Sequence, residues 1–300
     1  MRFEEMTPEE ARADFLSQAE SFAALFGPER PVARVENRTI PGGAGPIPVR
    51  VYWPETGVKL PVLVYYHGGG LVFGTLDSTD RICRTLAADG RVIVVSVDYR
   101  LAPEHKFPAA ADDSYAAYEH VLSNAGELDA GGAPIAVGGD SAGGNLAAVT
   151  CLMARDRQRP LPSFQLLVYP VTDYEDDRPS MREFADGHLL TGRAMDWFWG
   201  HYVASGEQGR HPYASPLRAE SLDGLPPALV ITAECDVLRD QGEAYGLRLI
   251  EAGVPTEIKR YEGAIHAFFQ MGAAIDSGRE ALADAAAALR RALHGEGRSA

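Results

Sequence analysis

Short apolar runs alternate with helical patterns along most of this 300-residue chain. Most of the runs are continuous and rich in β-branched residues, as expected of strands that are buried on both faces of a sheet. The runs cover residues 49–53, 60–66, 92–97, 134–137, 164–169, 228–232 and 256–261, and the helical patterns cover about 79–88, 109–123, 142–156, 239–252 and 277–293. Strands that alternate with helices predict a mainly parallel sheet covered by helices on both faces.

Two segments depart from this alternation. Apolar side chains recur at helical spacing in the N-terminal segment until Gly27 and Pro28 interrupt the pattern. The stretch PGGAGPIP at residues 41–48 then indicates a hinge, with a boundary near residue 45. Residues 177–216 are polar, rich in Trp, Tyr and His, and without a strand pattern, so they indicate an insertion above the sheet edge.

The N-terminal segment and the insertion can together form a lid over a pocket, and a plain surface excursion is the alternative interpretation of the insertion. The bulky side chains expected to roof such a pocket are Phe15, Phe22, Phe26, Trp197 and Trp199. The predicted organisation is an N-terminal cap segment at 1–45, a core at 46–176 and 217–300, and a cap insertion at 177–216.

Charge and cysteine content limit the class of partner. A formal net charge of −14 argues against nucleic acids and anionic membranes, because phosphate groups demand a basic surface. The three cysteines are odd in number and lack metal-ligand spacing, so they indicate neither a disulfide framework nor a zinc site. The N-terminus is acidic where a secretory signal is basic, and no apolar stretch approaches the roughly 20 residues that span a bilayer. We expect a cytoplasmic protein, without stable membrane association, that acts on a small molecule.

The motif GDSAGG at residues 139–144 directly follows the predicted strand 134–137 and directly precedes a helical run. Strand, tight turn and helix form the setting of the G-x-S-x-G nucleophile elbow, in which a strained turn exposes the serine hydroxyl. Glycines on both sides of Ser141 let such a turn close. A chance glycine-rich loop or an anion-binding helix N-terminus is the alternative. We interpret Ser141 as a candidate nucleophile.

A second motif, His67-Gly68-Gly69-Gly70, follows the predicted strand 60–66. In hydrolases with a nucleophile elbow, an HGGG loop at this place turns backbone N–H groups toward the substrate carbonyl oxygen. The candidate oxyanion-hole donors are therefore Gly68, Gly69 and Ala142, the residue after the nucleophile. We expect His67 to brace the loop, because it precedes the serine, where a general base does not occur in this arrangement.

The acid and the base should follow the serine in the order Ser, Asp or Glu, His. Among the later histidines, His266 comes just after the last predicted strand, whereas the others fall in the insertion or in the C-terminal tail (His188, His201, His211 and His294). Asp236 follows the strand 228–232, at the kind of strand end that carries functional groups in open α/β sheets. Glu234 and Asp240 remain competitors for the role of acid.

Five motifs in the same order give the chain a resemblance to a known family: HGGG, DYRLAPEHKFPAA at 98–110, GDSAGG, YPVTD at 169–173 and ECDVLRDQGEAY at 234–245. The chain resembles the hormone-sensitive lipase family of bacterial esterases, within the α/β-hydrolase superfamily. The resemblance spans nearly the whole chain. Two positions depart from the family pattern, Val237 in place of a proline and Ala267 in place of a frequent glycine.

The resemblance implies an α/β-hydrolase fold, with a mostly parallel eight-stranded sheet flanked by helices and a helical cap. It implies a triad of Ser141, Asp236 and His266, hydrolysis of short-chain acyl esters, no cofactor and no metal, and homodimers formed through the last strand. An amidase or peptidase with the same triad is one alternative function. A non-catalytic small-ligand receptor of the same fold is another, although such receptors lack the catalytic histidine.

Overall fold

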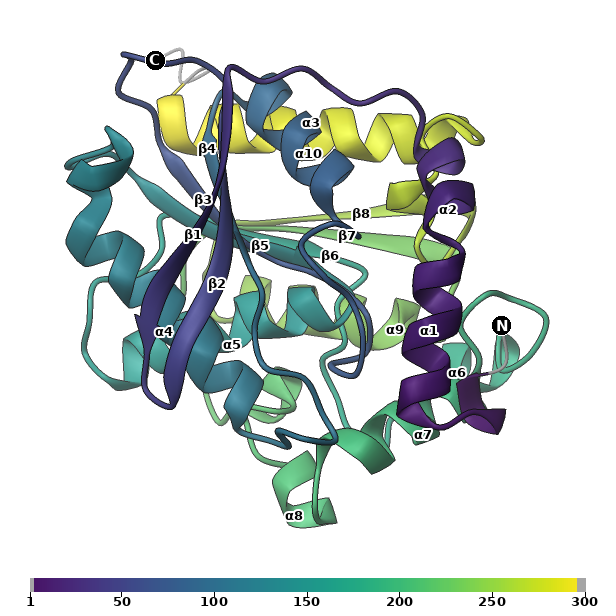
Figure 1. Ribbon diagram of the computed structural model, residues 1–300. Coiled ribbons are helices and arrows are strands. Elements are labelled where there is room, and N and C mark those ends of the chain that lie inside the picture. The colour runs from purple at the N-terminus through teal and green to yellow at the C-terminus, as the bar shows by residue number, and fades with distance from the viewer. Residues whose placement is uncertain (1–2, 296–300) are drawn as a thin grey trace.

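The computed structural model describes residues 3–295, apart from the side chains at positions 19, 20 and 22. An eight-stranded sheet runs through the centre in the order β1-β2-β4-β3-β5-β6-β7-β8 (Figure 1). The strands are β1 (Arg34–Gly42), β2 (Gly45–Trp53), β3 (Val62–Tyr66), β4 (Ile93–Val97), β5 (Ile135–Asp140), β6 (Gln165–Val168), β7 (Ala228–Cys235) and β8 (Thr256–Ile265). Pairing is antiparallel from β1 to β4 and parallel from β4 to β8, which confirms the predicted mainly parallel sheet.

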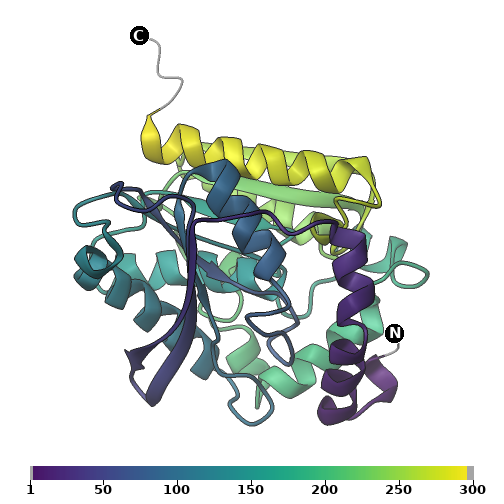
Figure 2. The same ribbon diagram turned by 45° about the horizontal axis from the view of Figure 1, so that its top comes forward.

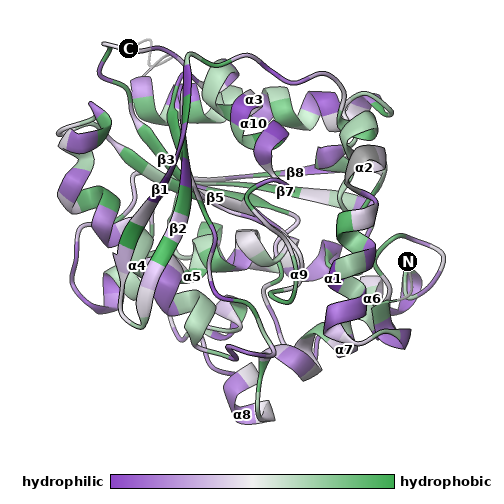
Figure 3. Ribbon diagram, in the orientation of Figure 1, coloured by the Kyte–Doolittle hydropathy of each residue, from purple (hydrophilic) through white to green (hydrophobic). Residues whose placement is uncertain are grey.

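Helices cover both faces of this sheet (Figures 1 and 2). One face carries α3 (Asp80–Gly90) and α10 (Asp276–His294), and the other carries α4 (Ala109–Asn124), α5 (Ala142–Asp156) and α9 (Arg239–Glu251). Successive residues of a strand point to opposite faces, so Leu63 packs in the core on one side and Val64 in the core on the other. The central strands are accordingly mainly apolar (Figure 3), with Ser96, Asp140 and Gln165 as buried polar residues. Within residues 3–295 no helix is long and apolar enough to cross a membrane.

The first strand of the sheet is the main departure from the predicted elements. Residues 34–42 form β1, which pairs with β2, and the Gly/Pro-rich stretch predicted as a hinge contains the turn between them, with Gly42 opposite Gly45. The predicted boundary near residue 45 therefore falls inside a hairpin. β1 lies at the sheet edge and, of its nine residues, only Ile40 is buried. A strand with one buried side chain lacks the apolar pattern that identified the central strands.

The N-terminal segment forms η1 (Phe3–Glu5), α1 (Pro8–Ser17) and α2 (Ala19–Phe26). A capping box starts α1, in which the Thr7 side chain accepts from the Glu10 N–H and the Glu10 side chain accepts from the Thr7 N–H. Helix α2 ends at Phe26 and is capped by Gly27, which has a φ of 99°. On the inner side of α1, Arg12 Nε and Nη2 donate to the carbonyl oxygens of Val72 and Ala102, at 2.8 Å each. These bonds fix α1 to the loops above the sheet.

The insertion at 177–216 forms α6 (Pro179–Glu183), α7 (Gly192–Tyr202) and α8 (Gly206–Gly209), and η3 (Pro216–Arg218) begins at its end. Helix α7 lies beside the N-terminal segment in both ribbon views (Figures 1 and 2). Trp197 Nε1 donates to the Met6 carbonyl oxygen at 3.1 Å, and the Phe3 and Phe198 rings are 6.0 Å apart. Two segments far apart in the sequence thus pack against each other at the carboxyl end of the sheet.

Candidate active site

Ser141 occupies the sharp turn between β5 and α5. Its backbone has a φ of 56° and a ψ of −116°, a conformation that is unfavourable for a residue with a side chain. The turn closes because glycines flank it: a Cβ on Gly143 would lie 1.9 Å from the Tyr66 carbonyl oxygen, and one on Gly139 would lie 2.4 Å from the Gly143 backbone. The predicted nucleophile elbow therefore has the geometry that its sequence requires.

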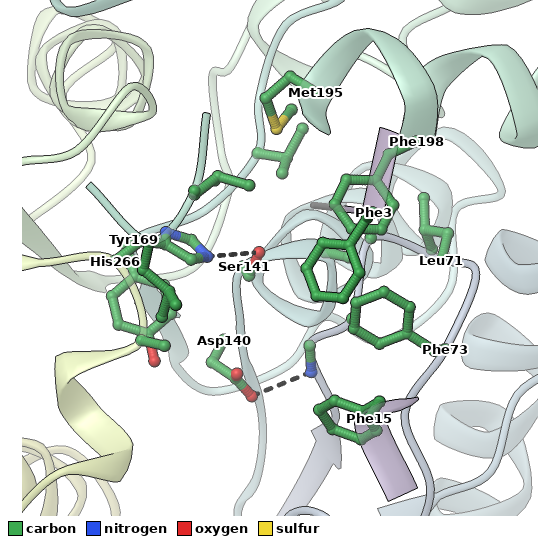
Figure 4. A pocket seen from close by; sticks show the side chains of 18 of the residues that line it. Phe3, Phe15, Leu71, Phe73, Asp140, Ser141, Tyr169, Met195, Phe198 and His266 are labelled. Carbon is green, nitrogen blue, oxygen red and sulfur yellow. Dashed lines mark hydrogen bonds between the residues drawn. The ribbon is translucent and has the colours of Figure 1, made fainter. Parts of the chain in front are cut away.

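His266 and Asp236 meet Ser141 from two other strand ends. His266 follows β8, and its Nε2 lies 3.1 Å from Ser141 Oγ (Figure 4). Asp236 follows β7, and its Oδ2 lies 2.7 Å from His266 Nδ1. A carboxylate only accepts hydrogen bonds, so Nδ1 carries the proton and Nε2 is left free to accept from the serine hydroxyl. All three residues are less than one-tenth exposed.

The two competing carboxylates are held elsewhere. Glu234 Oε2 accepts from the Gly263 N–H at 2.6 Å. Asp240 lies in the first turn of α9, where its Oδ2 accepts from the Ser180 N–H at 2.8 Å and its Oδ1 accepts from Arg239 Nε at 2.8 Å. Of the three acids weighed from the sequence, Asp236 is the one that contacts His266.

The loop after His266 shows why a glycine is frequent at the next position. Ala267 has a φ of 65° and a ψ of 8°, the left-handed conformation that glycine adopts without steric cost. This chain therefore holds a side chain in that conformation beside the candidate base. Val237, which replaces a proline of the family pattern, is fully buried and leaves the contacts of Asp236 intact.

The HGGG loop is braced as expected, but one of its predicted donors is engaged. His67 Nδ1 lies 2.7 Å from the Gly68 carbonyl oxygen, and the imidazole stacks on the Tyr99 ring at 4.3 Å. Complete burial lowers the pKa of His67 to about 4, so it is neutral at neutral pH. The Gly68 N–H donates to Asp140 Oδ1 at 3.1 Å, whereas those of Gly69 and Ala142 have no hydrogen-bond partner within residues 3–295. Gly69 and Ala142 are thus the two predicted donors that remain free.

Asp140 is a site residue that the sequence analysis missed. Its buried carboxylate accepts from the Tyr65 hydroxyl at 2.8 Å, from the Gly68 N–H and from Gln270 Nε2 at 3.3 Å. It thereby joins the elbow to the HGGG loop and to the loop that follows His266. Burial raises the pKa of this carboxyl group. Its place inside GDSAGG was the available signal, but the spacing of the motif does not show what an aspartate there contacts.

A cavity of about 120 Å³ opens above Ser141. Its walls are mainly apolar and come from the N-terminal segment, the loop after the glycines, the insertion and the end of β6 (Figure 4). Of the predicted roof residues, Phe15 and Trp199 line this cavity. Phe26 lines a neighbouring cavity instead, Trp197 bonds to Met6, and the side chain of Phe22 lies outside what the structure describes.

Comparisons with known proteins agree with this fold. A family model described as "alpha/beta hydrolase fold" matches residues 63–270. The chain is 44% identical over 274 residues to the carboxylic ester hydrolase LipN of Mycobacterium tuberculosis, covering 87% of this chain and 72% of LipN. It is 38% identical over 251 residues to the ethyl acetate hydrolase of Pseudomonas putida, covering 82% and 79%. The solved structure of a Pyrobaculum calidifontis esterase matches with a TM-score of 0.92 at 44% identity, covering 96% and 94%.

Fold and site together define an α/β-hydrolase whose serine stands in a nucleophile elbow. The chain belongs to the hormone-sensitive-lipase-like family of carboxylesterases within that superfamily. It is a carboxylic ester hydrolase, because relatives that match most of its length at 44% and 45% identity are named as ester hydrolases.

Proposed function

We propose that the protein hydrolyses short-chain acyl esters through an acyl-enzyme, with Ser141 as nucleophile, His266 as general base and Asp236 as the acid that orients it. The observation that carries the proposal is the continuous chain of contacts at the floor of an apolar cavity: 3.1 Å from Ser141 Oγ to His266 Nε2 and 2.7 Å from His266 Nδ1 to Asp236 Oδ2. A serine hydroxyl is a weak nucleophile until a neighbouring base removes its proton.

In the first half of the reaction, Ser141 Oγ attacks the ester carbonyl carbon as its proton passes to His266 Nε2. Asp236 holds the imidazole in the required tautomer and stabilises the imidazolium that forms. The imidazolium then gives its proton to the leaving alcohol oxygen, and the acyl group remains on Ser141. In the second half, water attacks the acyl-enzyme by the same steps and releases the carboxylic acid.

The backbone N–H groups of Gly69 and Ala142 stabilise the oxyanion of the tetrahedral intermediate in this mechanism. Support comes from their lack of partners within the described residues and from the place of Ala142 as the first residue of α5, where unsatisfied N–H groups carry partial positive charge. Gly68, predicted as a third donor, instead positions the loop, because its N–H is bound to Asp140.

The substitution Gly69→Ala is expected to lower kcat by about 10²–10³-fold, the usual cost of losing one oxyanion donor. Gly69 has a φ of +114°, and a Cβ there would lie 2.1 Å from the Phe73 carbonyl oxygen, so the loop must shift and carry the N–H with it. Steady-state kinetics on p-nitrophenyl butyrate measure the effect. Gly43→Ala is a matched control because a Cβ at Gly43 meets nothing within 4 Å. Equal rates for Gly69→Ala and wild type would remove Gly69 from the oxyanion hole.

The acyl preference follows from the size of the cavity. Each buried methylene contributes about 0.8 kcal/mol, so kcat/KM should rise with acyl length until the tail meets the wall of the cavity and then fall through overpacking. A volume of about 120 Å³ sets that limit at a short chain. The relative from Pseudomonas putida is named for the hydrolysis of ethyl acetate, a short-chain ester. We place the preference between acetyl and hexanoyl groups.

A series of p-nitrophenyl esters from acetate to palmitate, each assayed below and above its aggregation threshold, tests this preference. The highest kcat/KM is expected at butyrate or a neighbouring length, with palmitate slower and with no jump in rate when substrate aggregates form. Deletion of residues 1–30 should flatten the profile, because Phe3 and Phe15 line the cavity. Faster cleavage of palmitate, or activation by aggregates, would identify a lipase that works at interfaces.

We also propose that the N-terminal helices and residues 177–216 act as the cap of the site, and that the protein is cytoplasmic and forms homodimers. The contact between the Phe3 and Phe198 rings and the hydrogen bond from Trp197 to the Met6 carbonyl oxygen support the cap. All three cysteines are free, which suits a reducing compartment. β8 pairs with β7 alone among the described strands, and such an open edge can pair with a second copy.

A further inference from the structure

A second cavity of about 390 Å³ lies beside the substrate cavity, beneath helices α1 and α2. We call it the side chamber. Three side chains, Phe15, Ser78 and Gln270, line both cavities and so form the wall between them. At its outer end the chamber reaches the surface, where the side chain of Asp77 is 83% exposed and that of Glu29 is 54% exposed. A group that passes the wall from Ser141 therefore enters a space that opens to solvent.

The side chamber differs in chemistry from the substrate cavity. Polar and charged residues (Thr75, Asp77, Ser78 and Arg50) line it beside the apolar Phe15, Leu16, Ala23 and Phe26. Ser78 Oγ donates to the Thr75 carbonyl oxygen at 2.7 Å, and Thr75 Oγ1 accepts from the Ser78 N–H at 3.2 Å. The charges are compensated: Arg50 Nη1 donates to Asp77 at 2.8 Å and to Asp80 at 3.3 Å. Such a lining offers hydrogen-bond donors and acceptors without a strong field of either sign. With apolar residues beside polar ones, it suits a neutral group that carries hydroxyls on a short carbon frame better than an ion.

The wall places the chamber on the leaving-group side of the nucleophile. Gln270 belongs to the loop that begins at His266, and His266 Nε2 must face the leaving oxygen in order to protonate it. In Figure 4, Phe15 and Met195 lie at opposite ends of the cavity with Ser141 between them. Both ends are apolar, but the end at Met195 does not adjoin the side chamber and suits the acyl tail. The end at Phe15 leads to the side chamber and is left to bind the alcohol portion of the ester.

We propose that the side chamber binds the alcohol portion of the ester and that the favoured substrates are short-chain acyl esters of polyols, such as glycerol or a sugar. This inference rests on the triad chemistry proposed above. It also gives the alcohol product a path to solvent while the acyl group stays bound to Ser141. Phe15, at the junction of both cavities, is then the side chain that sets how large an alcohol can pass.

Glyceryl monobutyrate and ethyl butyrate test the proposal because they share an acyl group and differ in the alcohol. For the wild type, kcat/KM is expected to be about tenfold higher for the glyceryl ester, the gain from two hydrogen bonds of ordinary net strength. The substitution Ala23→Trp fills the chamber from α2, and the ratio of the two rates should fall toward one. Ala283→Trp, on an exposed turn of α10, is the matched control and should keep the wild-type ratio.

Thr75→Val is a second test that leaves α2 unchanged. It removes a hydroxyl from the chamber without adding bulk, together with the hydrogen bond that Thr75 Oγ1 accepts from the Ser78 N–H. It should lower the same ratio severalfold. No preference for the glyceryl ester in the wild type, or a ratio unchanged in both variants, would overturn the assignment of the chamber. That failure differs from failure of the triad chemistry, in which the wild type would hydrolyse neither ester or Ser141→Ala would hydrolyse both.

Discussion

Replacing Ser141 with alanine is expected to lower kcat on p-nitrophenyl butyrate by roughly 10⁴–10⁶-fold, the range seen when a serine hydrolase loses its nucleophile. The hydroxyl is the group that attacks, and its partner in the structure is His266 Nε2. The fold should persist because alanine keeps the Cβ, so the backbone at a φ of 56° is no more strained than before. Burst and steady-state kinetics measure the loss, and circular dichroism with Tm verifies the fold.

Ser114→Ala is the matched control for this loss. Ser114 is also a buried serine, but its hydroxyl donates to the Ala110 carbonyl oxygen inside α4, away from the cavity. The substitution Ser114→Ala should lower the free energy of unfolding by about 1 kcal/mol and leave kcat within a factor of about two. Turnover by Ser141→Ala at a tenth of the wild-type rate or more would exclude Ser141 as the nucleophile.

The central sheet was predictable because strands that are buried on both faces show continuous apolar runs in their own residues. Residues 60–66 and 92–97 are continuous apolar runs, and they contain β3 and β4. β1 was not predicted as a strand, because Ile40 is its one buried residue and its partner β2 stabilises it by backbone pairing. A strand that is stabilised mainly by pairing with its neighbour has no clear apolar pattern in its own residues.

The candidate site was also predictable where its features are local in the sequence and not where they depend on distant residues. Ser141 and His266 were identified because a motif and a strand end are local features, and the structure brings both together with Asp236. The hydrogen bond from the Gly68 N–H to Asp140 joins the loop after β3 to the last residue of the neighbouring strand β5, 72 residues apart in the sequence. No spacing rule reports such a contact, because it depends on the register of β3 against β5. The side chamber also arises only when α1 and α2 fold back over the sheet.

Asp236→Asn should be nearly as damaging as the loss of the nucleophile, with kcat lower by about 10⁴-fold, as in serine proteases. An asparagine can present its NH₂ group to His266 Nδ1, which favours the tautomer that carries the proton on Nε2. In that tautomer the imidazole cannot accept the proton of Ser141. Asp236 does not line the substrate cavity, so KM should change little while kcat falls. A lower kcat with an unchanged KM distinguishes the loss of a positioning carboxylate from the collapse of the pocket.

Asp240→Asn is the control that decides between the two acids. It loses charge beside Arg239 and weakens the bond from the Ser180 N–H, so it should lower Tm by loosening α6 against α9. Its kcat should remain within a few-fold of wild type, because Asp240 has no contact with His266 whereas Asp236 lies 2.7 Å from Nδ1. Because the two variants make the same chemical change four residues apart, general effects of charge removal cancel in the comparison. Near-normal turnover in Asp236→Asn together with an inactive, folded Asp240→Asn would reassign the acid and require His266 to turn toward α9.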